Sequence, residues 1–263
     1  MRHFDYPIID AHAHPYFKRN FSLDAPNNWE EYFSPLDEFG IDYFCGACNI
    51  RTDGRDFAVI AECNERVLTI QRQFPHRYYP GVNIHPNFPE ESCREVQRFY
   101  DLGFRWVGEI AGYVMGYQDY CSPGMFTILE LVRDLGLTLN IHPSSIDDMQ
   151  RLLQNFPTLP VVIAHPGPGD AAREKIALLR QYPNAYLDLS GGGILGYGIL
   201  RAILNAAGKG RLLFGTDYPV CNPACYLYGV LGEKLRPEEN RAIFHDNFLA
   251  LTGWQLPRQP SLN

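Results

Sequence analysis

The sequence has few features of a protein that binds a polyanion or spans a membrane. Its 263 residues carry 23 Lys and Arg against 30 Asp and Glu, a formal net charge of -7. It therefore lacks the general basic surface of a nucleic-acid-binding protein. No run approaches the roughly 18 consecutive apolar residues that a membrane-spanning helix needs, and the opening MRHFDYPIID lacks the apolar segment of a signal peptide. We expect a cytoplasmic protein that contacts neither nucleic acid nor membrane.

Seven cysteines are present, but their spacing does not indicate a structural zinc site. Cys45 and Cys48 lie in an expected strand, where residues three apart face opposite sides. Cys221 and Cys225 are close enough in sequence to chelate a metal, but a closed zinc site needs about four such ligands. We therefore expect free thiols, as in a reducing compartment.

What the sequence does contain is a regular alternation of apolar runs and amphipathic segments. Eight short apolar runs lie at residues 7–14, 41–50, 78–86, 104–113, 137–145, 161–167, 185–192 and 211–220. Nearly continuous apolarity over such lengths is typical of strands buried on both faces of a parallel sheet. Helical patterns separate these runs, for example at residues 55–74, 90–103, 122–136 and 145–156, and residues 236–253 predict a closing helix.

Eight alternations of strand and helix within about 250 residues match the size of a (β/α)8 TIM barrel, an α/β fold. An open, doubly wound sheet is the alternative. No linker, charge run or low-complexity segment marks a second domain. We therefore expect a single barrel domain over residues 1–263.

The opening stretch PIIDAHAHPYF, residues 7–17, places an aspartate and two histidines at alternate positions. In a strand, Asp10, His12 and His14 would project from the same face, which is a geometry that chelates a metal ion. Asp10 lies one pleat below the two imidazoles. We interpret it as an acceptor that orients an imidazole, with a buried carboxylate at the strand start as the alternative.

Further residues with ligand chemistry stand at the ends of later strands, where a barrel gathers its active residues. Imidazole and carboxylate groups together suit a divalent ion, zinc or possibly manganese. The expected metal ligands are His12, His14, Glu109, His142, His165 and Asp217. Because six ligands exceed the need of one ion, we expect one or two ions per chain, with Glu109 as the bridge between two.

These positions resemble the metal site of the amidohydrolase superfamily, a group of metal-dependent hydrolases with ligands on strands one, four, five, six and eight. The motifs DAHAHP, IHP, IAHPG and FGTDYP resemble the amidohydrolase-related branch, which includes hydrolases, lactonases and aromatic-acid decarboxylases. Members of the urease and dihydroorotase type add a β-sandwich built from both chain ends. Here the first motif begins at His12 and only a short tail follows Asp217, so we expect no added sandwich.

The resemblance leaves two reactions open. The segment VGEIAG resembles binuclear hydrolases, which place a carboxylate at the position of Glu109, whereas the decarboxylases are typically mononuclear. We therefore predict a hydrolase in which metal-bound hydroxide attacks a small amide, lactone or ester while Asp217 transfers the proton. The alternative is a metal-dependent decarboxylase of an aromatic or unsaturated acid. A catalytically silent binding protein is a further alternative to both enzymes. The expected partner is a small-molecule substrate, and a homo-oligomer is possible.

Three other residues are predicted to serve the site. His85, in NIHP, has an end-of-strand position, and we expect it to contact substrate or to hold a catalytic water. Arg51 follows the second strand and is expected to bind a substrate carboxylate or phosphate. Tyr113 is in phase with Glu109 and is expected to reach the substrate pocket, with aromatic packing as the alternative.

Overall fold

Eight short parallel strands form the centre of the computed structural model, which describes residues 3–15, 26–194 and 196–256. The strands are β1 (Ile8–Asp10), β2 (Ile41–Gly46), β3 (Tyr78–Pro80), β4 (Trp106–Ile110), β5 (Thr138–Ile141), β6 (Val161–Ile163), β7 (Ala185–Asp188) and β8 (Leu212–Leu213). They pair in sequence order as one sheet of β1 to β3 and one of β4 to β8. Every residue of β4 is buried, as expected for a strand covered on both faces.

Main-chain hydrogen bonds join the two sheets at both seams. Between β3 and β4, the Val82 amide donates to the Trp106 carbonyl at 3.0 Å, and the Gly108 amide donates to Val82 at 2.8 Å. Between β8 and β1, the Ala11 amide donates to the Phe214 carbonyl at 2.8 Å. The strands therefore form a closed ring, which confirms the predicted (β/α)8 TIM barrel and excludes an open sheet.

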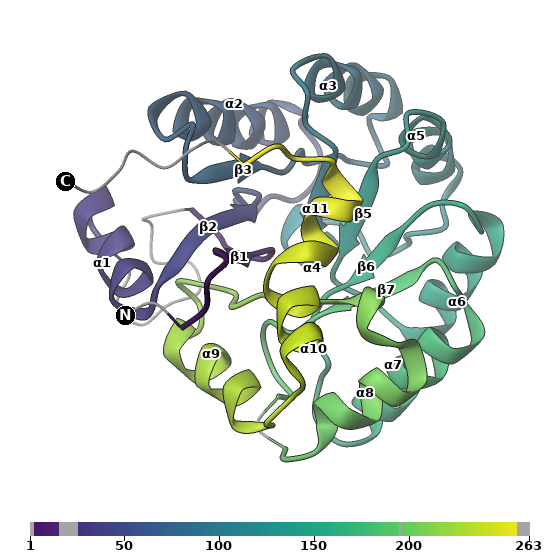
Figure 1. Cartoon of the computed structure of the whole chain (residues 1–263). Helices are drawn as coiled ribbons and strands as arrows, with labels where there is room; N and C mark the ends of the chain where they lie inside the picture. The colour runs from purple at the N-terminus through teal and green to yellow at the C-terminus, as the bar shows by residue number, and fades with distance from the viewer. Residues whose placement is uncertain (1–2, 16–25, 195, 257–263) are drawn as a thin grey trace.

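Helices surround this ring and return the chain from each strand to the next (Figure 1). They are α1 (Trp29–Phe39), α2 (Ala58–Gln73), α3 (Pro89–Asp101), α4 (Gly112–Met115), α5 (Pro123–Asp134), α6 (Ile146–Asn155), α7 (Asp170–Gln181), α8 (Ile199–Ala207), the 3-10 turn η1 (Lys209–Arg211) and α9 (Pro223–Gly232). The helices predicted at 55–74, 90–103, 122–136 and 145–156 correspond to α2, α3, α5 and α6. Ser122 and Ser145 begin α5 and α6 by accepting hydrogen bonds from amides of the first turn.

The predicted closing helix consists of three consecutive segments, namely α10 (Pro237–Arg241), the π-helical turn η2 (Ala242–Asp246) and α11 (Asn247–Thr252). In Figure 1 this yellow part of the chain lies across the centre of the ring. Phe248 of α11 packs against Trp106, the first residue of β4, with ring centroids 5.2 Å apart. The helix therefore covers the amino ends of the strands, and the opposite end of the barrel is left for the site.

The strands are shorter than the apolar runs of the sequence. Since β1 ends at Asp10 and β8 contains two residues, His12, His14 and Asp217 lie on the segments that directly follow these strands. Among the described helices, none has both the length and the apolarity to span a bilayer. A single domain over all of residues 1–263 stays a prediction, because part of that range lies outside the described residues.

Candidate metal centre

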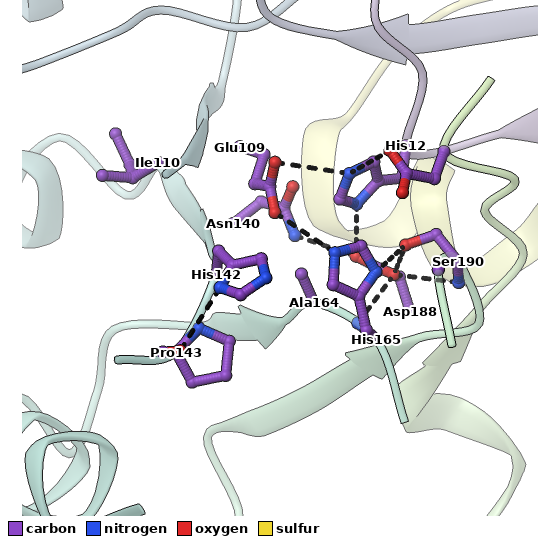
Figure 2. A network of polar contacts seen from close by, with 12 residues as sticks. His12, Glu109, Ile110, Asn140, His142, Pro143, Ala164, His165, Asp188 and Ser190 are labelled. Atoms are coloured by element: carbon purple, nitrogen blue, oxygen red, sulfur yellow. Dashed lines mark hydrogen bonds and ion pairs between the residues drawn. The ribbon is translucent and has the colours of Figure 1, made fainter. Parts of the chain in front are cut away.

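The carboxyl ends of five strands bring the predicted ligands together. Each lies on its strand or within a few residues of the strand's end: His12 and His14 follow β1, Glu109 belongs to β4, His142 follows β5, His165 follows β6 and Asp217 follows β8. In a parallel barrel these ends share one face. The fold therefore brings positions scattered along the sequence into one cluster, and Figure 2 shows four of its members, His12, Glu109, His142 and His165.

Among the predicted ligands, two groups of three residues have ligand atoms within 4.8 Å of one another. One group is His12, Glu109 and His165, and the other is His12, His14 and Asp217. Nε2 of His14 lies 3.1 Å from Oδ1 of Asp217 and 3.6 Å from Oε2 of Glu109. The other oxygen of Glu109, Oε1, lies 3.6 Å from Nε2 of His165. The Glu109 carboxylate therefore lies between the two groups.

His142 lies beside these groups and belongs to neither of them. Its ring centroid is 5.0 Å from that of His165. The structure thus brings five of the six predicted ligands into the two groups and places the sixth next to them.

A hydrogen bond on the outer side of each imidazole orients the ring. Nδ1 of His12 lies 2.9 Å from Oδ2 of Asp188, and Nδ1 of His165 lies 2.9 Å from Oγ of Ser190. The Nδ1 atoms of the other two imidazoles lie 3.2 and 3.3 Å from main-chain carbonyl oxygens. Such bonds leave Nε2 of each ring available to a metal ion.

The charges of the cluster favour a cation. Nε2 of His12 and Oε1 of Glu109 are buried without a hydrogen-bond partner among the described residues. Burial alone lowers the pKa of His12, but the carboxylates of Asp188 and Glu109 raise it well above its ordinary value. Burial alone raises the pKa of Glu109, but His12 and two other imidazoles lower it to about 2. The negative potential that favours a proton on the imidazoles also favours a divalent cation between them, so these residues fit zinc or manganese.

Two residues of the cluster have a left-handed backbone, which is costly for residues other than glycine. His165 has φ 60° and Asp217 has φ 62°. The main-chain oxygen of His165 accepts a hydrogen bond from Nζ of the buried Lys175 at 2.5 Å. Gly191 lies against the His165 ring, and a Cβ atom there would lie 2.2 Å from Nδ1. The surroundings of His165 therefore fix both its backbone and its ring.

Asp10 does not have the predicted role of orienting an imidazole ring. Its carboxylate accepts hydrogen bonds from the main-chain amide of His12 at 3.0 Å, and from the amide and hydroxyl of Thr216 at 3.0 and 2.5 Å. These bonds tie the segment after β1 to the segment after β8. Burial raises the pKa of Asp10 to about 7.

The carboxylate that does meet an imidazole ring is Asp188, which sequence reasoning missed. It is the last residue of β7 and is fully buried. Its sequence signal, in AYLDLSGG, is a carboxylate at the end of an apolar run, which is also the signal of Asp217.

His85 also needs correction, because both of its ring nitrogens bind the main chain. Nε2 lies 2.9 Å from the Met115 carbonyl oxygen, and Nδ1 accepts from the Asn87 amide at 3.1 Å. The residue is fully buried, and burial lowers its pKa. With no ring nitrogen left for substrate or water, His85 joins the segments after β3 and β4 instead of taking part in catalysis.

Arg51 and Tyr113 are both exposed, and Tyr113 contacts His142 of the cluster. The Tyr113 side chain is 52% exposed, and its ring centroid is 4.9 Å from that of His142. Burial, together with the charges of Glu109 and Asp217, raises the pKa of Tyr113, whereas the charge of Arg51 lowers it. Tyr113 therefore lies beside the cluster and within the range of the charge of Arg51, and substrate binding by the two residues stays a prediction.

Comparisons with solved structures find similar folds at low sequence identity. A 2,6-dihydroxybenzoate decarboxylase from Rhizobium has a TM-score of 0.72 at 16% identity, over 94% of this chain and 98% of that chain. A 5-carboxyvanillate decarboxylase from Novosphingobium aromaticivorans, complexed with manganese and a nitrobenzoic acid, has 0.71 at 15%, over 95% and 97%. A candidate 2-pyrone-4,6-dicarboxylic acid hydrolase from Pseudomonas putida has 0.69 at 18%, over 94% and 97%.

The sequence comparisons address the family directly. No curated protein matches the sequence. The family profile described as "Amidohydrolase" matches residues 9–251. This range includes all six predicted metal ligands and the barrel strands from Ile9 in β1 to the end of β8. The chain therefore belongs to this amidohydrolase family.

Proposed function

We propose that this chain is a metal-dependent decarboxylase of a small aromatic or unsaturated carboxylic acid. The observation that carries this proposal is the exposed ring of Tyr113 against His142, at the side of the cluster where the charge of Arg51 acts. A planar acid can stack on the tyrosine ring while its carboxylate meets the positive charge. The decarboxylases of hydroxylated benzoates among the similar structures support this reaction over the predicted hydrolysis.

The residues that would hold the ion are His12, His14 and Asp217, with Glu109 beside them. A divalent ion bound there would stabilise negative charge on substrate oxygens. Manganese is our first candidate because the 5-carboxyvanillate decarboxylase contains it, and the zinc expected from the sequence is the second.

Decarboxylation breaks the bond between the carboxyl carbon and the neighbouring carbon. The carboxyl group leaves as CO2, and the electron pair of the bond stays on the neighbouring carbon, which then needs a proton. When one ion occupies the group of His12, His14 and Asp217, His165 is not needed as a ligand. Its Nε2 faces the cluster at 3.6 Å from Glu109, and its ring is held from behind by Ser190. We assign delivery of the proton to His165, because imidazole transfers protons near neutral pH.

Hydrolysis is the second candidate, and the position of Glu109 favours it. Its two oxygens lie 3.5 and 3.6 Å from Nε2 of His12 and of His165, so the carboxylate can bridge two ions. In that case His165 is a ligand, and Asp217 takes and returns the proton during cleavage of an amide, lactone or ester. The candidate hydrolase from Pseudomonas putida supports this second reading.

The number of ions separates the two functions. The chain is purified without chelator, its metal content is measured by mass spectrometry, and it is incubated with hydroxybenzoates, unsaturated acids, lactones, esters and amides. We expect about one ion per chain and release of CO2. Two ions per chain with hydrolysis and no CO2 release would overturn the proposal in favour of hydrolysis.

Glu109→Gln adds a test in the same assays. Under the proposal, the variant still binds one ion. Its affinity for that ion falls by less than about 10-fold, which is the smallest loss typical of a supporting residue. A fall in occupancy from two ions to one would instead indicate a bridging Glu109 and the hydrolase.

A further inference from the structure

The buried carboxylate of Asp188 lies behind two of the imidazoles of the metal centre. Its Oδ2 accepts from Nδ1 of His12 at 2.9 Å and from the amide nitrogen of Asn140 at 3.0 Å. Its Oδ1 accepts from the amide and the hydroxyl of Ser190, with 3.1 Å for the amide, and lies 3.4 Å from the His165 amide. Figure 2 shows these contacts around one side chain at the end of β7.

The hydrogen atoms in this network can be placed because an ionised carboxylate only accepts. The main-chain amide of Ser190 and the side-chain amide nitrogen of Asn140 can only donate, and each occupies one oxygen of Asp188, so the carboxylate is the acceptor throughout this network. His12 must therefore carry its hydrogen on Nδ1. The Asn140 amide nitrogen donates its two hydrogens to Asp188 and to the Val162 carbonyl, the latter at 3.1 Å. It is therefore a second donor to Asp188 and cannot accept the hydrogen of His12.

The same argument continues through Ser190 to the second imidazole. The Ser190 hydroxyl hydrogen points to Oδ1 of Asp188. The hydroxyl oxygen can then only accept from His165, whose Nδ1 is 2.9 Å away. His165 must also carry its hydrogen on Nδ1, which leaves a lone pair on Nε2 at the cluster.

We infer that Asp188 is a positioning residue that sets the tautomer of His12 directly and that of His165 through Ser190, so that both Nε2 atoms face Glu109. The inference rests on the proposed metal centre and holds for either reaction. It explains why a carboxylate is buried at the end of β7, where it touches neither Glu109 nor Asp217 in any recorded contact among the described residues.

Two variants of the network and one matched control test the inference. In Asp188→Asn, a single amide oxygen replaces two carboxylate oxygens, so one side of the network must lose its acceptor. Ser190→Ala removes the link to His165 and leaves the bond between Asp188 and His12. Glu239→Gln is the control, because Glu239 is also a buried carboxylate, but its partners are Arg201 and Arg236 instead of an imidazole ring.

The first measurement is the dissociation constant for Mn²⁺ by equilibrium dialysis. We expect Asp188→Asn to weaken binding by about 10- to 100-fold, the loss typical of residues that orient metal ligands. Glu239→Gln should change it by less than about 3-fold. Equal losses in the two variants would show a general effect of removing a buried charge and would overturn the inference, as would a parent protein that binds no Mn²⁺.

The second measurement is the position of the ring hydrogens, by long-range ¹H–¹⁵N NMR on metal-free protein labelled at histidine, at an alkaline pH where the rings are neutral. Signals are assigned with His12→Gln and His165→Gln. In the parent and in Glu239→Gln, both rings should carry the hydrogen on Nδ1. Ser190→Ala should disturb His165 alone, and Asp188→Asn should disturb both rings.

Unchanged rings in a folded Asp188→Asn variant would overturn the inference. If that variant does not fold, as judged by circular dichroism, an unchanged His165 ring in Ser190→Ala has the same meaning. Neither measurement requires turnover, so a protein without decarboxylase activity would contradict the proposed function and leave this test intact.

Discussion

Nε2 of His14 lies 3.1 Å from Oδ1 of Asp217, although one residue follows the first strand of the barrel and the other follows the last. The contact depends on closure of the ring, because the His14 amide donates to the Tyr218 carbonyl at 2.7 Å. This part of the metal centre therefore exists only in the folded chain. An ion bound there would stabilise the fold, because the unfolded chain has no such site.

Metal binding should depend on pH with a defined sign. In the ion-free protein, carboxylates raise the pKa of both His12 and His14 above 6.5, although burial opposes this. Protons therefore compete with the ion around neutral pH and are released when it binds. We expect the Mn²⁺ dissociation constant from equilibrium dialysis to fall by about 10-fold or more between pH 6 and pH 8.

The exposed His76 provides the control for this experiment. His76→Ala should keep the same pH dependence, whereas His14→Ala should weaken both the binding and its dependence on pH. A dissociation constant that does not change between pH 6 and pH 8 would contradict the prediction.

Gly191→Ala should disturb the metal centre through His165. A Cβ at this position would lie 2.2 Å from Nδ1 of His165, and the backbone has φ 59°. The left-handed backbone alone costs about 1–2 kcal/mol for a residue with a Cβ. We expect a lower free energy of unfolding in urea and a loss of catalytic activity.

The neighbouring Gly192→Ala is a matched control, because an added Cβ there meets no atom within 4 Å. It should leave both quantities near the parent values. The prediction fails if the two alanine variants behave alike.

Tyr113→Ala tests the proposed aromatic wall of the substrate pocket. Because the side chain is half exposed, its loss should leave the fold and Mn²⁺ binding unchanged. An aromatic pair contributes about 0.5–1.5 kcal/mol, so KM for an aromatic acid should rise by up to about 10-fold while kcat changes little. Tyr228, which is 49% exposed, provides the control Tyr228→Ala. Equal KM values in the two variants would remove Tyr113 from the site.

Phe248→Ala should destabilise the barrel without touching the metal centre. Phe248 is 2% exposed and packs on Trp106 and Tyr79, with ring centroids 5.2 and 5.7 Å apart. Loss of a buried phenylalanine typically costs about 3–5 kcal/mol, which urea unfolding would measure. Leu102→Ala, at a side chain 55% exposed, should cost less than about 0.5 kcal/mol. A Phe248→Ala variant as stable as Leu102→Ala would show that α11 does not support the barrel.

The sequence by itself determined the barrel and the place of its site. Runs of buried residues alternate with helical patterns eight times, and parallel strands linked by helices close into a ring of this size. The same topology puts the carboxyl ends of all strands on one face. Residues as distant as His12, Glu109 and Asp217 could therefore be assigned to one site before their positions were known.

Only the tertiary structure decided which strand-end residues serve that site. Asp188 ends β7 and His85 lies in the segment after β3, yet the ring of His85 is bound by the main chain, whereas Asp188 orients His12. Asp10, which alternates with His12 in the sequence, instead binds Thr216 at the seam between β1 and β8. Strand periodicity predicts on which side of a strand a residue lies. This prediction holds only as far as the strand extends. Beyond that point, local backbone turns and partners from other strands decide where each polar atom is directed.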